Sequence, residues 1–372
     1  MSVEWHRLGE YIEVSTKHNA DIKYGTELIE GVNSVGEFCK PKACLDGIDL
    51  KPYKIVRPGD FVYNPSRINI GSLAYRKNPM CIVSHLYVVF HLTEYGKTKL
   101  IAEYLFLYLQ RDEFRRLVTY RNFGSQRPEF NFRQMCEVEI PVPPIAEQRK
   151  VVEAWQGLRK MKEENEQLAE PLLALCRSYL QEIKKKYPMK EIGPMIILSD
   201  EVNEGGKNLP VVGVNFQKEF MPTAANMDGI DTSKYKVMKS GRFVFSGMQT
   251  GRDVCIRIGL WDSADESLMS PAYTTFELKH DCGVLPEYFF LMFKRTEMDR
   301  LGWFYSDSSV RSNLDWPRFE MIKIPVPPIE VQQAVVDLYR CANEAKKIAA
   351  EADKLSREIC PALIQRVVKE VA

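Results

Sequence analysis

The four residues Asn64, Pro65, Ser66 and Arg67 come nearest to a catalytic motif in this chain. Amino-methyltransferases carry Asn or Asp, two prolines and then Tyr or Phe, and here Ser66 stands where the second proline would be. The glycines at 247 and 251 are not followed by the Lys and Ser or Thr of a phosphate-binding loop. The chain also lacks the His-Glu-x-x-His pattern of zinc proteases and the Gly-x-Ser-x-Gly nucleophile elbow.

Residue types that bind metals or act as bases are scattered along the chain. The five histidines, at positions 6, 18, 85, 91 and 280, lie far apart, and none of the nine cysteines forms a Cys-x-x-Cys pair. Dispersed cysteines in odd number are typical of reduced, buried thiols and not of a disulfide framework. We therefore expect no catalytic residue, no metal and no cofactor, with a site assembled from distant positions as the open alternative.

The composition indicates a globular protein with room for two or three domains. The chain has 372 residues, of which 45% are hydrophobic and 27% are charged. No apolar run approaches the length of a membrane span, and the first residues lack the pattern of a secretory signal. These features predict a cytoplasmic protein without membrane contact.

The formal net charge of +1 gives no overall sign of nucleic-acid binding. The local balance of charge differs. Positions 51 to 77 contain six basic residues and one acid, Asp60, and positions 236 to 257 contain five basic residues and one acid, Asp253. Either stretch alone could be ordinary solvated surface. Both stretches fall at matching places in an internal repeat, which favours a functional surface.

The two halves of the sequence align when one is shifted by 184 positions. The phrase Ile140-Pro-Val-Pro-Pro-Ile-Ala-Glu-Gln148 recurs as Ile324-Pro-Val-Pro-Pro-Ile-Glu-Val-Gln332. The same shift places Arg111, Glu113, Arg116, Ser125 and Arg127 on Arg295, Glu297, Arg300, Ser309 and Arg311. Small changes in the shift upstream indicate insertions in loops. The chain is therefore two copies of one unit of about 185 residues.

Each copy begins with a part that is predicted to mix strands and helices. Short runs of β-branched and aromatic residues predict the strands, and Gly and Pro separate them. The strand candidates are Asp60–Tyr63, Cys81–Leu92, Arg242–Phe245 and Tyr273–Leu278, and the helix candidates are Glu103–Leu117 and Pro286–Leu301.

Each copy ends in a segment rich in Glu, Lys, Gln, Ala and Leu, in which apolar residues recur at steps of three and four. Such spacing is typical of a coiled coil. The stripes are Val151, Trp155, Leu158, Leu168, Leu172, Leu175 and Tyr179, and Leu338, Ala342, Ala345, Ala349, Ala352, Leu355, Ile359 and Leu363. An isolated amphipathic helix is unstable in water, so we expect the two segments to pack together. Two unrelated core helices are the alternative.

Prolines delimit and interrupt these helical segments. Proline is tolerated in the first turn of a helix, so the two Pro-Val-Pro-Pro phrases should fix each domain's angle to its helix. Pro171 and Pro361 lie inside the stripes and are expected to kink or break the helices. The predicted boundaries are 1–144 and 187–328 for the two mixed domains, and 145–186 and 329–372 for the helices.

The parts of the chain occur twice in the same order: a mixed domain with the strand start Gly59–Val62, the Ile140–Gln148 phrase and then a long helix. In this order the chain resembles the specificity subunit of type I restriction–modification systems. The resemblance spans the whole chain. The second copy departs from the family pattern, because Arg242 replaces Asp60 and Glu330-Val331 replaces Ala-Glu. The resemblance implies an α+β fold with two mixed α/β target recognition domains and an antiparallel coiled-coil spacer of two long helices.

The resemblance also implies a function and partners. Each target recognition domain would read one half of a split target in double-stranded DNA, and the spacer would fix the gap between the halves. The subunit would have no catalysis of its own and would bind two DNA adenine methyltransferase subunits, which use S-adenosylmethionine, and two ATP-driven motor and endonuclease subunits. One alternative is a related system whose partner fuses methylase and nuclease in one chain. Another is an interaction scaffold that binds no DNA.

Polar, basic and turn-rich loops are the candidate DNA contacts, because their side chains can bind base edges and phosphates. The candidates are Asn64, Ser66, Arg67, Asn69, Arg76, Arg121, Ser125, Gln126 and Arg127 in the first domain, and Gln249, Thr250, Arg252, Ser308, Ser309 and Arg311 in the second. Any of them could instead be a solvated loop residue or make an internal hydrogen bond. Arg127 and Arg311 match between the copies, which favours phosphate contact or a structural role over base reading.

Overall fold

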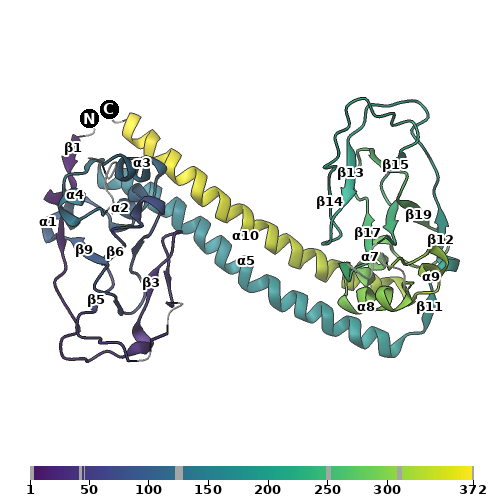
Figure 1. The fold of residues 1–372 in the computed structure, drawn as a ribbon, viewed down its shortest axis with the longest axis horizontal. Helices are drawn as coiled ribbons and strands as arrows, with labels where there is room; N and C mark the ends of the chain where they lie inside the picture. Colours follow the sequence, from purple (N-terminus) through teal and green to yellow (C-terminus); the bar gives the residue numbers. More distant parts are fainter. Residues whose placement is uncertain are drawn as a thin grey trace. The chain divides into compact units, whose positions relative to one another are not determined.

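The computed structural model describes residues 4–41, 44–45, 47–121, 129–248, 253–307 and 312–370. They form two compact units, one of residues 1–165 with 347–372 and the other of residues 166–346. Each unit contains one mixed domain and one half of each of two long helices, α5 (Ile145–Lys186) and α10 (Ile329–Glu370) (Figure 1). Segments far apart in the sequence therefore share one unit.

The first unit is built on an antiparallel sheet of order β2-β9-β6-β7. Phe61 and Tyr63 of β6 point to one face, where helices cover them, and Val62 points to the other face, where smaller sheets pack. This alternation follows from the two-residue period of a strand. The strands are β1 (Glu4–Arg7), β2 (Ile12–Val14), β3 (Gly31–Val32), β4 (Phe38–Cys39), β5 (Lys54–Val56), β6 (Phe61–Tyr63), β7 (Leu73–Tyr75), β8 (Cys81–Val83), β9 (Val88–Leu92) and β10 (Glu139–Val142).

The helices of the first domain are short. They are α1 (Glu94–Lys99), α2 (Ala102–Leu109), α3 (Asp112–Arg121) and α4 (Phe132–Cys136), with 3-10 turns η1 (Leu8–Glu10), η2 (Thr26–Leu28) and η3 (Ile68–Ile70). Strand β1, at the start of the domain, pairs antiparallel with β10, at its end. This pairing closes the domain just before α5 begins.

The second unit repeats the main sheet with the order β12-β19-β16-β17. The two small sheets β3-β4 and β5-β8 of the first unit correspond to one four-stranded sheet here, of order β14-β13-β18-β15. Strand β11 pairs with β20 as β1 pairs with β10. The strands are β11 (Met189–Glu191), β12 (Ile196–Leu198), β13 (Val211–Val214), β14 (Phe220–Pro222), β15 (Lys236–Met238), β16 (Phe243–Ser246), β17 (Arg257–Leu260), β18 (Ser267–Met269), β19 (Thr274–Leu278) and β20 (Lys323–Pro325). Its other elements are η4 (Gly193–Met195), α7 (Pro286–Phe293), α8 (Thr296–Tyr305) and α9 (Trp316–Glu320).

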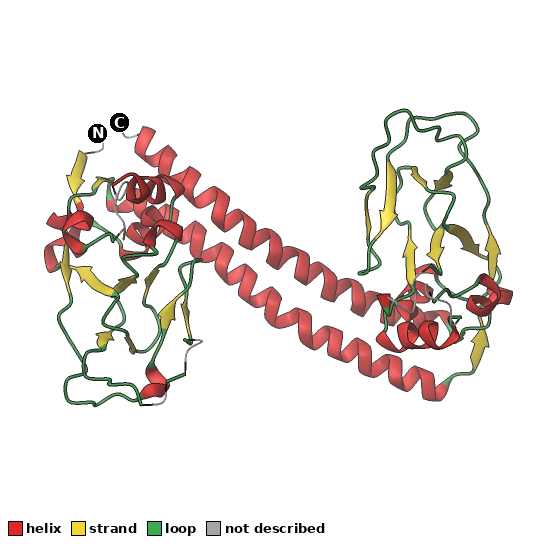
Figure 2. Cartoon of the chain, viewed as in Figure 1, coloured by secondary structure: helices red, strands yellow, loops and turns green. Residues whose placement is uncertain are grey.

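The two domain cores share a stacked aromatic pair at the same place. Phe61 of β6 stacks on Phe90 of β9 with ring centroids 4.9 Å apart, and Phe243 of β16 stacks on Phe276 of β19 at 5.0 Å. All four rings are fully buried. The predicted α+β fold with two similar mixed domains and long helices is therefore confirmed (Figure 2).

Some predicted elements were too long. The run Cys81–Leu92 forms two strands, β8 and β9, because the chain turns at Ser84, whose carbonyl accepts the Tyr87 N–H at 3.0 Å. The predicted helix Glu103–Leu117 is two helices, α2 and α3, and Pro286–Leu301 divides into α7 and α8. The apolar period continues across each break, so the period alone could not locate it.

Both long helices continue through their prolines, so of the predicted kink or break at Pro171 and Pro361 the break is wrong, and the kink stays a prediction. Pro171 lies on the exposed side of α5. The carbonyl of Gln167, which loses its helical partner there, can bond to water instead. Packing along the rest of the helix outweighs the local cost of about 3 kcal/mol.

Inside each unit the helix halves run antiparallel. In the first unit Lys162 of α5 pairs with Asp353 of α10 at 2.8 Å, and the α5 residues Val151 and Trp155 share a core cluster with Ile364. In the second unit Glu170 pairs with Lys346 at 3.1 Å. The predicted stripe was wrong at Leu168 and Leu175, which are 51% and 53% exposed, because the seam is formed one residue further on. The buried residues there are Ala169 and Cys176.

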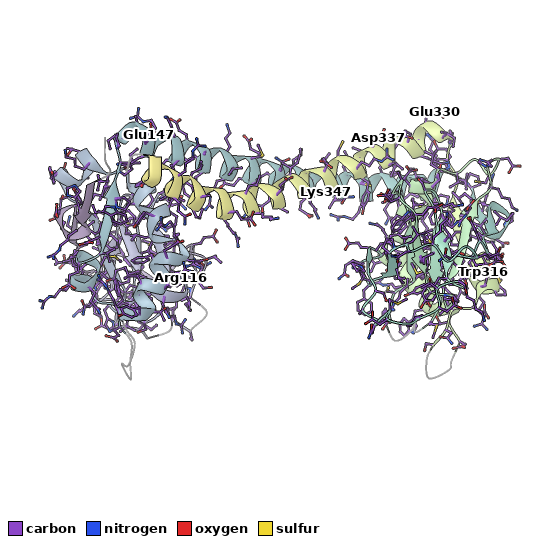
Figure 3. The ribbon with its side chains drawn as sticks, turned by 90° about the horizontal axis from the view of Figure 1, so that it is seen from above. Arg116, Glu147, Trp316, Glu330, Asp337 and Lys347 are labelled. Carbon is purple, nitrogen blue, oxygen red and sulfur yellow. The ribbon has the colours of Figure 1, made fainter. Side chains whose placement is uncertain are left out.

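A buried glutamine joins each domain to its helix. Gln148 donates from Nε2 to the carbonyls of Lys99 and Pro143, both at 2.8 Å, and its Oε1 accepts the Ile101 N–H at 2.8 Å. Gln332 makes the same three bonds, to Gly283, Pro327 and Leu285, at 2.8 to 2.9 Å. Figure 3 labels Glu147 and Glu330, which lie beside these glutamines in the first turns of α5 and α10. The last residue of each repeated proline phrase thus stabilises the junction between the mixed domain and its long helix.

Candidate nucleic-acid interface

The first predicted loop follows β6 and is shaped by its own polar groups. Asn64 Oδ1 accepts the Ser66 N–H at 3.0 Å, and the Asn64 carbonyl accepts the Arg67 N–H at 3.0 Å. This turn leaves the Ser66 and Arg67 side chains exposed, while Asn64 and Asn69 are partly buried. The loop thus directs polar and cationic side chains to solvent, as an anion-binding surface requires.

A glycine closes this loop. Gly71 has φ of +99°, a backbone conformation that other residues rarely adopt. A Cβ at this position would come within 2.3 Å of the Ser34 carbonyl oxygen and 2.9 Å of Arg115 Nη2. The close approach lets the loop rest against helix α3.

The second predicted segment begins with Arg121 at the end of α3, and the rest of it lies outside the described residues. The described residues that flank it lie beside the first loop. The Phe130 N–H, just beyond the segment, donates to the Pro65 carbonyl at 3.0 Å. Asn69 lines one hollow of about 470 Å³ together with five α3 residues, Asp112, Arg115, Arg116, Thr119 and Tyr120. The described ends of the second predicted segment, helix α3 and Phe130, therefore lie against the first loop in the first unit.

The second unit has the same contact between described residues that flank its two predicted loop segments. The Leu314 N–H donates to the Gly247 carbonyl at 2.9 Å, and these residues align with Phe130 and Pro65 in the repeat. A Cβ at Gly247 would lie only 1.7 Å from the Leu314 carbonyl oxygen, so this approach requires glycine. The scaffold under the loops is thus the same in both units.

Several predicted contacts take other roles in the structure. Arg76 is 4% exposed, donates to Glu30 at 2.7 Å and to the Pro79 carbonyl, and stacks on the Phe38 ring at 4.7 Å. Its guanidinium is fully engaged inside the domain, which removes it from the proposed contacts. Arg121 donates to the carbonyls of Gln134 and Glu137 at 3.1 and 3.4 Å and so ties α3 to α4.

The remaining predicted residues divide into two groups. Asn64, Ser66, Arg67 and Asn69 lie together on the first loop. The residues Ser125, Gln126, Arg127, Gln249, Thr250, Arg252, Ser308, Ser309 and Arg311 lie outside the described residues. The arginines Arg115 and Arg116 were missed, although Arg116 already matched Arg300 in the repeat.

Most cations of the two basic stretches are paired with acids, and all but one of these acids, Asp253, lie outside the stretches in the sequence. The pairs are Arg76–Glu30, Lys77–Glu103, Lys236–Asp200, Lys239–Glu201, Arg242–Glu277 and Arg257–Asp253. A local count of charge therefore overstated the free positive surface, and the exposed Arg67 is the stronger candidate.

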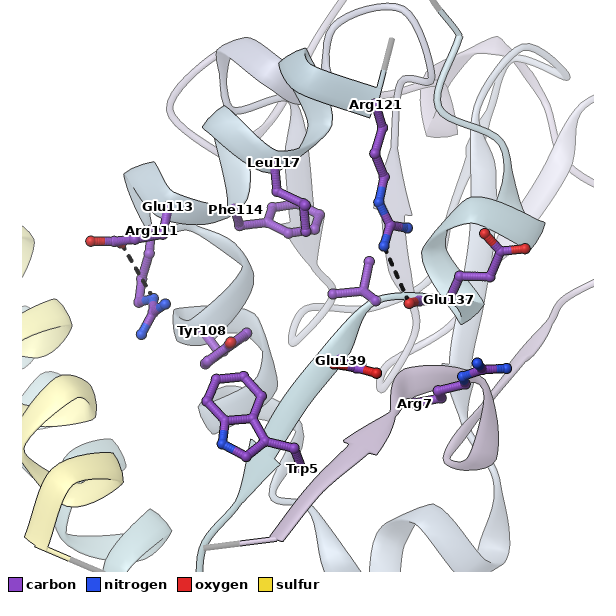
Figure 4. A pocket seen from close by; sticks show the side chains of 11 residues that line it. Trp5, Arg7, Tyr108, Arg111, Glu113, Phe114, Leu117, Arg121, Glu137 and Glu139 are labelled. Carbon is purple, nitrogen blue, oxygen red and sulfur yellow. Dashed lines mark hydrogen bonds and ion pairs between the residues drawn. The ribbon is translucent and has the colours of Figure 1, made fainter. Parts of the chain in front are cut away.

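A larger cavity of about 730 Å³ opens between α3, α4 and the β1–β10 pair (Figure 4). Three arginines, at positions 7, 111 and 121, share it with three glutamates, at positions 113, 137 and 139. Arg111 stacks on Tyr108 at 4.3 Å, and burial raises the pKa of that tyrosine, so its hydroxyl stays protonated. Arg111 pairs with Glu113 at 3.6 Å and Arg121 donates to the Glu137 carbonyl, so two of the three arginines are engaged within the domain.

Metal ligation finds no support in the part of the chain that the structure describes, where no group of three or more His, Cys, Asp or Glu side chains could hold an ion. In the same residues no helix combines the length and the apolar character needed to span a bilayer.

The fold defines a duplicated protein in which two alike domains are joined by long helices. A family model described as the type I restriction modification DNA specificity domain matches residues 9–170 and 182–339. The two matches cover most of the chain and follow its two copies, so the chain belongs to this family. Specificity subunits of the family have no catalytic activity of their own.

Three solved structures resemble the chain over nearly its whole length. The S subunit of a type I restriction–modification system from M. genitalium has a TM-score of 0.62 and 12% identity, covering 98% of this chain and 96% of that chain. The HsdS subunit from Thermoanaerobacter tengcongensis has a TM-score of 0.44 and 15% identity, covering 99% and 97%. A chain from a study of assembly and conformational transition of the type I R-M system has the same TM-score and identity, covering 100% and 97%. No curated protein matches the sequence.

Proposed function

We propose that this chain reads a bipartite sequence in double-stranded DNA and carries the methyltransferase and restriction subunits of a type I system to it. Each unit supplies one reader for one half of the target. The readers act in the cytoplasm as part of an assembly, and the chemistry of methylation and cleavage belongs to the partner subunits.

The observation that carries this proposal is a matched contact at the base of the predicted loops in each unit. The hydrogen bonds Phe130–Pro65 and Leu314–Gly247 join corresponding backbone positions that flank the predicted loop segments. The residues on these loops differ between the copies, as Asn64-Pro-Ser-Arg67 corresponds to Ser246-Gly-Met-Gln249. A constant scaffold with variable loops suits two readers that recognise different half-sites.

The duplication also supports the proposed partners. Two copies of one unit offer two equivalent surfaces, so two copies of one methyltransferase subunit can bind in equivalent ways. The net charge of +1 is compatible with DNA binding when the partner subunits supply part of the phosphate contact.

Replacing Arg67 with alanine tests the DNA-binding face. We expect the assembled methyltransferase to bind its target several-fold more weakly, and the slope of log K against log salt to fall by about one if Arg67 contacts a phosphate. Filter binding across a salt titration measures both quantities. Lys97→Ala, which removes the same charge from helix α1, is the matched control and should leave both unchanged.

Unchanged affinity of Arg67→Ala across the titration would rule out this loop as the contact. Failure of the wild-type assembly to bind any duplex would instead favour the scaffold without DNA. The identity of the neighbouring subunit, as separate methyltransferase or as a fused methylase and nuclease, is settled by purifying the assembly and determining its chains.

A further inference from the structure

Two aromatic side chains stand almost fully in water at the same place in the two units. Tyr120 is 81% exposed and Phe304 is 80% exposed, the highest values of any large hydrophobic side chain among the described residues. They align in the repeat, and each lies in the last turn of its helix, α3 or α8. An isolated exposed ring is unremarkable. The recurrence of such a ring at one position on two diverged domains points to a shared use.

Each ring has an exposed arginine on the same helix face. Arg116 precedes Tyr120 by four residues, and Arg300 precedes Phe304 by four residues. Residues four apart lie one above the other on a helix, so each helix end presents one cation and one ring side by side. The Arg116 side chain is 73% exposed, and its contact with Glu113 is a loose one at 3.6 Å (Figure 3). Such a cation remains available to an anionic partner.

The surroundings of the ring continue the candidate interface. In the first unit Tyr120 lines the hollow that also contains Asn69 and Arg115. In the second unit the ring of Phe304 lies 5.6 Å from that of Tyr305, whose carbonyl accepts a hydrogen bond from Arg318 at 2.9 Å. An aromatic ring beside arginines is complementary to a nucleic acid, which offers apolar base faces next to phosphates.

We infer that Tyr120 and Phe304 are DNA-contacting wedges, each of which packs against the bases of one distorted step beside its own half-site, while Arg116 and Arg300 bind neighbouring phosphates. This inference rests on the proposed function and deepens it. Each ring exchanges exposure to water for contact with bases that the distortion uncovers. Both units therefore distort their half-sites in the same way, whatever sequence their loops read.

The test uses the assembly of the full chain with its methyltransferase subunits and a duplex that carries its methylation target. A 2-aminopurine base is moved through the positions beside each half-site, and its fluorescence rises where a step is unstacked. We expect Tyr120→Ala to abolish the signal at one half-site and Phe304→Ala to abolish it at the other. Each substitution should weaken binding by roughly tenfold without changing the salt slope, because no phosphate contact is lost.

Two controls separate the wedge from a general loss of structure. Tyr120→Trp keeps a ring and should keep both the signal and the affinity. Leu86→Ala removes another apolar side chain of the first unit, 66% exposed, and should change neither.

Wild-type affinity and fluorescence in both alanine variants would overturn the inference. So would loss of the methyltransferase subunit from either variant in gel filtration, because the ring would then be a protein contact. If Arg67→Ala weakens binding while the aromatic variants do not, the wedge fails and the proposed function stands. If the wild-type assembly binds no duplex, both fall.

Discussion

A buried charge changes sign between the two copies, and its partner changes with it. Asp60, 9% exposed, lies 3.7 Å from His91, whereas Arg242, 6% exposed, donates to Glu277 at 2.8 Å. The strand registers place the two pairs at the same positions, directly beside the stacked phenylalanines. The sequence showed Arg242 in place of Asp60 as a departure from the family pattern. The structure explains it as one half of a paired exchange.

The paired exchange predicts that the two positions are coupled in stability. Asp60→Arg alone buries a guanidinium without a carboxylate partner at that position, and we expect it to destabilise the first unit by about 3 to 5 kcal/mol. Adding His91→Glu supplies the carboxylate that Arg242 has in the second unit and should recover part of that loss. The recovery is partial because Glu13, 3.1 Å from His91, would repel the new carboxylate, whereas Ile197 stands opposite Glu277. Denaturant unfolding of the wild type, both single variants and the double variant measures the coupling. A double variant no more stable than Asp60→Arg would refute the exchange.

The same carboxyl predicts a dependence on pH. Burial raises the pKa of Asp60, while the Arg57 N–H and His91 oppose the rise. A carboxyl with a raised pKa contributes stability that is fully present below its unfolded pKa, about 4, and is lost as the pH rises through the folded value. The Tm of Asp60→Asn should therefore increase relative to wild type between about pH 4 and pH 7.

Calorimetry of both proteins across this range measures the difference in Tm. Asp231→Asn is the control, because hydrogen bonds from Ser233 lower the pKa of that exposed carboxyl. Asp231 titrates below about pH 4, so the difference in Tm between Asp231→Asn and the wild type should not change between pH 4 and pH 7. A difference that is also flat for Asp60→Asn would show that the burial of Asp60 has no energetic effect.

At the scale of elements, the sequence predicted the kinds of element well and their ends less well. The strand candidates Asp60–Tyr63 and Arg242–Phe245 match β6 and β16 closely, because their apolar runs begin after a glycine turn. The breaks inside the helix candidates were missed because they contain no glycine or proline. At the first break the side chain of Gln110 donates to the Leu73 carbonyl at 2.5 Å, a contact with a distant strand that no local pattern reveals.

The repeated proline phrase contained its most informative residue at its end. The prolines marked a junction in the sequence, but only the structure shows that Gln148 and Gln332 are fully buried and each satisfy three backbone groups. The residues before the glutamine differ between the copies while the glutamine bonds do not. The junction is therefore constrained by hydrogen bonding more than by the proline backbone alone.

The three hydrogen bonds of each buried glutamine predict a large loss of stability when the glutamine is replaced. Gln148→Leu fills similar volume but leaves two carbonyls and one N–H without partners, and we expect a loss of about 3 kcal/mol or more in the free energy of unfolding. Gln332→Leu should do the same in the second unit. The neighbouring Gln333 bonds only to Asp337 on the helix surface, so Gln333→Leu should cost less than about 0.5 kcal/mol. Equal effects of Gln332→Leu and Gln333→Leu in urea unfolding would contradict a stabilising role for the buried glutamine.

At the scale of the whole molecule, a repeat copy and a compact unit are different things. The sequence repeat suggests a division near position 186, whereas the units divide inside both helices, at Asn165 and Lys346. The apolar stripes predicted that each helix needs a partner. They could not show that the end of the chain completes the first unit. Periodicity identifies the apolar face of a helix but not the part of the other helix that packs against it.

The division inside the helices predicts where the chain tolerates a change in length. Seven residues inserted after both Asn165 and Lys346 preserve the apolar stripe, because a heptad nearly completes two helical turns. Each helix becomes longer by about 10 Å, which corresponds to roughly three base pairs of duplex. If the helices set the spacing of the half-sites, the gap in the recognised target should increase by about that number. Sequencing the methylated adenines in a host that carries the full system reads the gap directly.

A four-residue insertion at the same two places is the control. It adds about 6 Å but rotates the stripe further out of register, so we expect it to weaken helix packing and methylation at every gap. An unchanged gap in a stable seven-residue variant would show that the helices join the two readers without measuring the distance between them. If each unit reads only its own half-site, as proposed, the partner subunits would then have to set that distance.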